Sequence, residues 1–146
     1  MEKRVNIYET EPTGYKALLG LESYLATTSI SKTTKELIKI RASQINGCAF
    51  CINMHTTDAR KHGETEQRIY LLNAWKEVEN LYTDEERVVL ALTEEITLIA
   101  NGGVSDATYK KAQAMFNDTE IAQIIMAIIA INAWNRLAIA TQLQPA

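Results

Sequence analysis

The sequence predicts an all-α protein of about seven helices. Apolar residues recur at three- and four-residue intervals along most of the chain, and residues that cap helices precede these segments. No alternation of strand-like and helix-like segments is visible. The two prolines, Pro12 and Pro145, lie near the ends of the chain, so the long stretch between them lacks the residue that most often breaks a helix.

Four helices are expected in the first half of the chain. Leucines at helical spacing mark the first, and Gly47 and Gly63 end the second and third, because glycine readily adopts the left-handed backbone that terminates a helix. The second begins at Ser31 or at Thr33, where Thr33 and Glu36 have the spacing of a capping box. The expected ranges are 14–26, 31–46, 48–63 and 65–77.

Three more helices are expected in the second half. Thr83 begins the first of them with a cap and early acidic residues, and Ser105 and Asp118 cap the other two. The expected ranges are 84–101, 106–116 and 118–141. The last helix is apolar nearly all round from Ile121 to Ile139, which predicts a buried position and, in a domain this small, some contact with another subunit.

Composition and charge exclude several classes of protein. The 146 residues are expected to form one domain with its core over residues 18–139. A net charge of −3 without a run of Lys or Arg argues against nucleic acid and an anionic membrane as partners. The N-terminus lacks the apolar segment of a secretory signal, and the longest apolar run, 124–131, is too short to span a bilayer. We therefore expect a cytoplasmic protein whose thiols are kept reduced.

The only two cysteines, Cys48 and Cys51, are the most informative residues. On a helix, positions three apart share a face with Cβ atoms about 5–6 Å apart, which is close enough for a disulfide after small adjustment. The free N–H groups at a helix start favour the thiolate, which points to Cys48 as the more acidic thiol. His55 lies on the same stripe and can take a proton from a thiol. Glu36, on the preceding helix, would orient the imidazole if the two side chains meet.

Other interpretations of these residues stay open at this point. The cysteines could be packing residues, or they could bind zinc together with His55 and His62, although one rigid helix cannot wrap its residues tetrahedrally around an ion. Glu36 could serve as the capping acid for Thr33 instead of contacting His55. Structural rather than catalytic roles are expected for a further group: Trp75, Tyr82, Trp134, Asn135 and Arg136.

The spacing of Glu36, Cys48, Cys51 and His55 resembles the alkylhydroperoxidase D-like (AhpD-like) group of the carboxymuconolactone decarboxylase superfamily. The resemblance covers residues 18–139 and is strongest over 36–63. It implies an all-helical homo-oligomer, commonly a trimer or hexamer, with peroxidase and disulfide-reductase chemistry that uses no metal, haem or other cofactor. By this resemblance, Cys51 matches the peroxidatic cysteine, Cys48 the resolving cysteine, and Glu36 and His55 the proton relay. Phe50 stands where the founding type has a second histidine.

The leading functional hypothesis is therefore an antioxidant thiol peroxidase. Its partners would be a hydroperoxide substrate and an external dithiol that reduces the Cys48–Cys51 disulfide. Three alternatives belong to other classes: a general disulfide oxidoreductase, a lactone decarboxylase that does not need the cysteines, and a redox-sensing protein without enzymatic activity.

Overall fold

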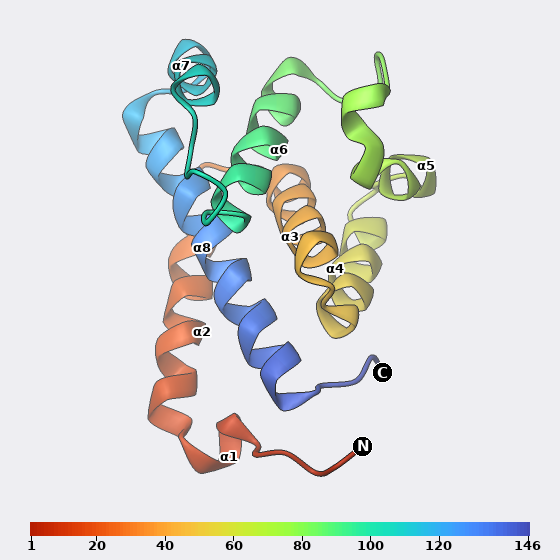
Figure 1. Ribbon diagram of the computed structural model, residues 1–146, viewed down its shortest axis with the longest axis vertical. Coiled ribbons are helices and arrows are strands. Elements are labelled where there is room, and N and C mark those ends of the chain that lie inside the picture. The colour runs from red at the N-terminus through yellow and green to blue at the C-terminus, as the bar shows by residue number, and fades with distance from the viewer.

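The computed structural model describes residues 1–146 and is helical throughout, without a strand (Figure 1). The all-α prediction is therefore confirmed. In chain order the elements are α1 (Ile7–Thr10), α2 (Pro12–Ala26), α3 (Lys32–Asn46), α4 (Ala49–Lys61), α5 (Glu66–Tyr70), the 3-10 helix η1 (Leu72–Glu77), α6 (Asp84–Thr97), α7 (Asp106–Met115) and α8 (Asp118–Thr141).

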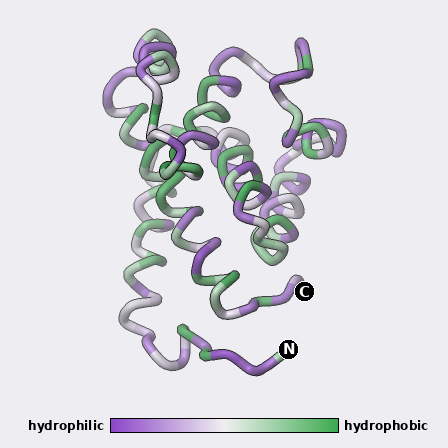
Figure 2. Tube along the Cα trace, in the orientation of Figure 1, coloured by the Kyte–Doolittle hydropathy of each residue, from purple (hydrophilic) through white to green (hydrophobic).

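Helix α3 connects the two halves of the molecule, because it packs against α4, α6 and α8. On the other side of α8 lies α2, which runs beside it in Figure 1. Both ends of the chain lie at the same end of the molecule, where Arg4 Nη1 donates to the carbonyl of Ala140 at 2.8 Å. The N-terminal segment is largely hydrophilic, whereas α8 is mostly hydrophobic (Figure 2).

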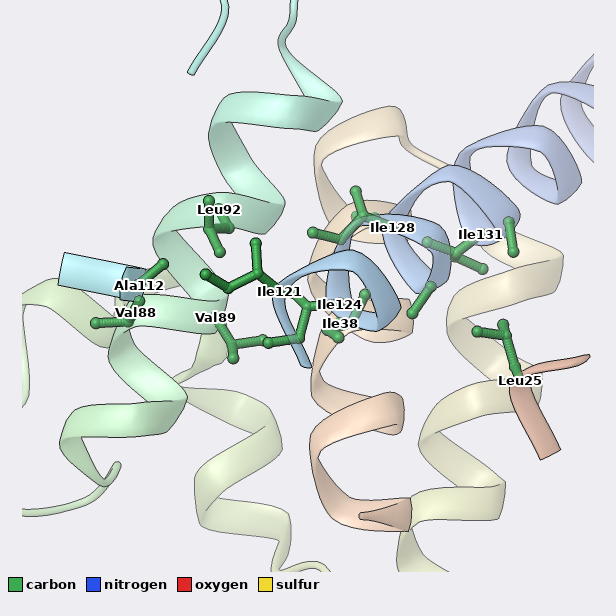
Figure 3. Close-up of a cluster of buried hydrophobic side chains, with 13 residues drawn as sticks. Leu25, Ile38, Val88, Val89, Leu92, Ala112, Ile121, Ile124, Ile128 and Ile131 are labelled. Atoms are coloured by element: carbon green, nitrogen blue, oxygen red, sulfur yellow. The ribbon is translucent and has the colours of Figure 1, made fainter. Parts of the chain in front are cut away.

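Two buried clusters hold these helices together. The larger one brings together side chains from α2, α3, α6, α7 and α8, and Leu25, Ile38, Leu92 and Ile128 are among them (Figure 3). The second cluster fixes α4 and η1 against α3 and α6. Its members are Leu37, Ile40, Ala59, Leu72, Trp75, Tyr82 and Leu90. The two clusters together bury α3 on two sides, and this helix carries the predicted site residue Glu36.

Several predicted boundaries are confirmed at their capping residues. Gly47 ends α3 with φ of +70°, and Ser105 caps α7 by accepting a hydrogen bond from the Thr108 N–H. Thr83 begins α6 with a complete capping box. In each case a short-range interaction decides the boundary, so the local sequence is sufficient to predict it.

Several elements differ from the prediction. The expected helix over 65–77 is divided into α5 and η1, and the backbone departs from helical geometry at Ala74 (φ −115°, ψ 22°). The one-turn helix α1 was not expected. Helix α6 ends at Thr97, and residues 98–103, which include the glycine pair, form hydrogen-bonded turns instead of a last helical turn. Asn117 rather than Asp118 caps α8, in a reciprocal pair with Glu120.

Helix α8 is less buried than its composition predicts. Ile129 and Ile139 are each 44% exposed, so one stripe of the helix faces outward in the single chain. Its 24 residues and its most apolar window, of mean hydropathy 1.6, also meet the length and composition of a membrane-spanning helix. The short apolar run therefore does not exclude a span by itself. The interior position of α8 instead follows from its contacts with α2, α3, α4, α6 and α7.

Candidate active site at the start of α4

The turn between α3 and α4 determines where the two cysteines lie. Asn46-Gly47 reverses the chain, with Gly47 in the left-handed region, and the Cys48 N–H donates back to the Ser43 carbonyl at 3.0 Å. Cys48 then takes the N-cap position of α4, where its Sγ accepts a hydrogen bond from the Cys51 N–H at 3.3 Å. The local sequence thus places one sulfur at a helix N-terminus and the other one turn further along.

Cys48 and Cys51 form a disulfide, with their Cα atoms 5.3 Å apart. Both residues are buried. The structure therefore agrees with the expectation that the two sulfurs are close enough to bond, and it joins the N-cap to the first turn of the same helix. A bridge of this kind can open and close while α4 stays folded, because it crosses no distant segments.

Glu36 and His55 meet between α3 and α4. The Nδ1 atom of His55 lies 3.1 Å from Oε2 of Glu36, and the two side chains are 9% and 14% exposed. The capping alternative is wrong, because Ser31 caps α3 by accepting from the Thr34 N–H, which leaves Glu36 free to reach α4. A carboxylate on Nδ1 orients the ring and leaves Nε2 as the nitrogen available for proton transfer.

A pocket of about 390 Å³ opens beside the second cysteine. Cys51 and His55 both line it, whereas Cys48 and Glu36 do not. Most of the remaining lining side chains are apolar, and they come from α2, α4, α8 and the C-terminal tail: Tyr15, Leu19, Phe50, Met54, Trp134, Leu137, Ala138 and Leu143. Cys51 is therefore the sulfur that a ligand in this pocket would meet, and Cys48 lies behind it. This arrangement favours Cys51 as the cysteine that reacts with a substrate, as the family resemblance implies, over Cys48, which the helix N-terminus would make the more acidic thiol.

The pocket also contains charged residues that the sequence analysis missed. Lys39 Nζ lies 3.4 Å from Oε2 of Glu22, and Trp134 Nε1 donates to the other Glu22 oxygen at 3.1 Å. Asp58 completes the polar part of the lining. Lys39 follows Glu36 by three residues and so shares its face of α3, which was the available signal. The contact with Glu22 depends on how α2 packs beside α3, which the spacing of residues along the chain does not give.

A buried polar network fixes the turn that carries Cys48. Asn135, on α8, has no exposed surface, and its Nδ2 donates to Ser43 Oγ at 2.9 Å. Its Oδ1 accepts from Asn46 Nδ2 at 2.9 Å, and Asn46 also donates to Asn132. The expected structural role of Asn135 is confirmed by these contacts. Trp75 and Tyr82 are buried in the core, as expected. Trp134 packs against the larger cluster and also lines the pocket.

The zinc alternative finds no support in the geometry. His62 is exposed at the C-terminal end of α4, far along the helix from the cysteines at its start. No three His, Cys, Asp or Glu side chains are grouped so that they could hold a metal ion.

Comparison of the sequence with known proteins gives one family match and two similar proteins. A sequence profile described as the carboxymuconolactone decarboxylase family matches residues 12–95. The uncharacterized protein YdfG of Bacillus subtilis (strain 168) is 49% identical over 140 residues, which are 96% of this chain and 95% of that protein. Alkyl hydroperoxide reductase AhpD of Maricaulis maris is 40% identical over 45 residues, only 31% of this chain and 26% of that protein.

A solved structure shows the same arrangement of helices over the whole chain. It is a protein of unknown function from Agrobacterium tumefaciens, named as a candidate antioxidant defence protein AhpD. The TM-score is 0.94 at 39% sequence identity, and the match covers 99% of each chain. The AhpD-like fold is therefore shared along the full length of the protein.

Proposed function

The chain belongs to the carboxymuconolactone decarboxylase family, and from this premise we propose that it is a thiol peroxidase that reduces organic hydroperoxides through Cys48 and Cys51. One observation carries the proposal. Cys51 and His55 line a mostly apolar pocket, and Glu36, which does not line it, contacts Nδ1 of His55. Cys51 would be the nucleophile, His55 the base, and Glu36 the group that orients the base, and the pocket beside them has room for a substrate.

The proposed cycle has three steps. The Cys51 thiolate attacks the outer oxygen of the hydroperoxide, so that an S–O bond forms, the O–O bond breaks, and the departing alkoxide takes a proton to become an alcohol. The Cys48 thiol then attacks the sulfenic acid, forming the Cys48–Cys51 disulfide and releasing water. An external dithiol reduces the disulfide by exchange and is itself oxidised. The disulfide in the structure supports the second step.

Glu36 and His55 have separate roles in this proposal. His55, one turn after Cys51 on α4, removes the thiol proton through Nε2. Glu36 orients the ring through Nδ1 and stabilises the imidazolium that forms. Phe50 lines the pocket in place of the second histidine of the founding type, so a single histidine serves as the base.

The assignment of the two cysteines is tested by trapping the intermediate. A reduced Cys48→Ser variant cannot form the disulfide, so tert-butyl hydroperoxide should leave a sulfenic acid on Cys51 that a dimedone-type trap captures for mass spectrometry. The matched Cys51→Ser variant should give no trapped product. A trapped group on Cys48 in the second variant, with none on Cys51 in the first, would reject the assignment.

A general disulfide oxidoreductase is the second candidate, and the Cys48–Cys51 bridge itself favours it. The two functions differ in which oxidant reacts faster. If the protein is a peroxidase, tert-butyl hydroperoxide should consume the thiols faster than a small disulfide does. The reverse order would favour the oxidoreductase.

We also propose that the protein forms a homo-oligomer, a trimer or a hexamer. The exposed Ile129 and Ile139 of α8 support this, because apolar surface on a central helix is commonly covered by another subunit. Light scattering coupled to gel filtration should give a mass that is three or six times that of the chain. A mass of 16.4 kDa would contradict the proposal.

A further inference from the structure

Lys39 places an ammonium group in the same pocket as Cys51 and His55. Its side chain is 13% exposed, and its Nζ has one protein partner, Glu22 Oε2 at 3.4 Å. A lysine ammonium has three N–H donors. Two of them are therefore uncommitted in a mostly apolar pocket, where a hydrogen bond to a charged group is stronger than in water.

The ammonium is held in place from two other helices. Glu22, on α2, binds Lys39 with one carboxylate oxygen and the indole N–H of Trp134, on α8, with the other. Because both oxygens are occupied, the carboxylate has a fixed orientation and limits where the lysine can lie. Donors that are oriented before the reaction stabilise developing charge better than donors that must first reorganise.

Lys35, one turn earlier on α3, shows the contrast. Its Nζ donates to the backbone carbonyl of Leu25, and it does not line the pocket. Burial, together with the neighbouring charge of Lys39, lowers the pKa of Lys35. Lys35 therefore binds a carbonyl in the last turn of α2, whereas Lys39 lines the pocket where a substrate would bind.

We propose that Lys39 is a catalytic residue that donates a proton to the leaving oxygen of the hydroperoxide. This inference rests on the proposed function and adds the missing acid to it. As the Cys51 sulfur bonds to the outer oxygen and the O–O bond breaks, the electron pair moves to the inner oxygen, and an N–H of Lys39 protonates that alkoxide. The resulting amine regains, through solvent, the proton that His55 removed from Cys51. The net reaction converts thiol and hydroperoxide into sulfenic acid and alcohol.

The test compares two reactions of Cys51 in the reduced full-length protein. Oxidation by tert-butyl hydroperoxide releases an alkoxide that needs a proton, whereas alkylation by iodoacetamide releases iodide, which does not. We expect Lys39→Met to slow oxidation by about tenfold to hundredfold and alkylation by less than about threefold. Lys39→Arg should restore part of the oxidation rate, and Lys35→Met, the matched control, should leave both rates as in the wild type.

Several results would overturn the inference. If Lys39→Met slows both reactions equally, the lysine acts only on the thiolate, and if it changes neither, the lysine has no catalytic part. Should Lys39→Met fail to fold, Glu22→Gln keeps the lysine and removes its anchor. That variant should slow oxidation more than alkylation, and an equal change in both would reject the inference. A wild-type protein whose thiols resist hydroperoxide would instead refute the proposed function.

Discussion

Two clusters of partly buried charge in this molecule differ in how completely their hydrogen bonds are used. Arg68, on α5, binds Glu64 at 2.7 Å and Glu86 at 2.7 Å, and it also donates to the Leu81 carbonyl. Its guanidinium lies 4.8 Å from the ring centroid of Tyr82. All three of its nitrogens have protein partners. The Lys39 ammonium and the His55 imidazole, in contrast, each have one partner and line a pocket.

This difference separates a structural ion cluster from a reactive one. Burial works to lower the pKa of Arg68, but the hydrogen bonds that it donates to Glu86 and Glu64 outweigh burial and raise the pKa above its usual range. A group so fully paired has nothing left to offer a ligand. Lys39 and His55 each keep hydrogen-bonding groups without a protein partner, and these groups are available to bind a substrate or to transfer a proton.

The largest expected effect is a loss of stability when the cluster of Arg68, Glu64 and Glu86 is broken. Arg68→Met leaves Glu64 and Glu86 without their buried cation, so the free energy of unfolding should fall by about 3–5 kcal/mol. Urea denaturation measures this change. The iodoacetamide rate of Cys51 below the unfolding transition should stay at the wild-type value. A loss of less than about 1 kcal/mol would mean that the cluster contributes no more than a surface ion pair.

The second expected effect concerns the site. Glu36→Gln keeps the shape of the side chain but removes the charge that stabilises the imidazolium, so oxidation of Cys51 by hydroperoxide should slow by about a hundredfold. Single-turnover stopped-flow measurement gives the rate. Glu66→Gln, which alters an exposed pair with Arg60, is the matched control and should react like the wild type. Equal rates for the two variants would remove Glu36 from the mechanism.

A smaller effect is expected for the polar network behind the turn. Asn135→Ala removes the donor to Ser43 Oγ and one of the two acceptors of Asn46 Nδ2, which should lower the free energy of unfolding by about 2 kcal/mol. Thermal and urea unfolding measure it against Gln113→Ala, an exposed amide on α7, which should change stability by less than about 0.5 kcal/mol. If the two variants are equally stable, the network does not hold the turn.

The smallest expected effect is a pH dependence at Glu94. Burial works to raise the pKa of Glu94, but hydrogen bonds from Lys76 and Trp75 and the charge of Arg41 outweigh it, so the pKa is lowered. Its contribution to stability is therefore complete above the ordinary glutamate pKa of about 4.3 and is lost as the pH falls through the lowered pKa of the folded state. Relative to Glu94→Gln, the wild type should lose up to about 1 kcal/mol more on acidification. A difference of the opposite sign would contradict the assignment.

Local patterns in the sequence predict the part of the site that lies on α4 and the turn before it. Cys48, Cys51 and His55 follow from helical spacing, and Gly47 from its backbone preference. The role of Glu36 stayed open because Ser31 and Thr33 are both competent caps, and only the packing of α3 on α4 decides between them. Similarly, Asn117 and Asp118 are adjacent residues with equal capping ability.

The spacing of apolar residues along the sequence does not predict contacts between distant segments. Glu22, Lys39 and Trp134 come from three helices, and no spacing rule relates them. The kink at Ala74, inside η1, also goes with a tertiary contact, because the next residue, Trp75, donates its indole N–H to Glu94. In both cases a tertiary hydrogen bond outweighs the local preference.

The central claim is that a hydroperoxide oxidises this protein at Cys51 and that Cys48 then closes the bridge. The most direct measurement mixes the fully reduced protein with substoichiometric tert-butyl hydroperoxide at neutral pH, counts the remaining thiols, and maps the products by mass spectrometry. We predict that each molecule of hydroperoxide removes both thiols of one chain and leaves the peptide linked between Cys48 and Cys51. Thiols that persist, or bridges that form only between chains, would contradict the account.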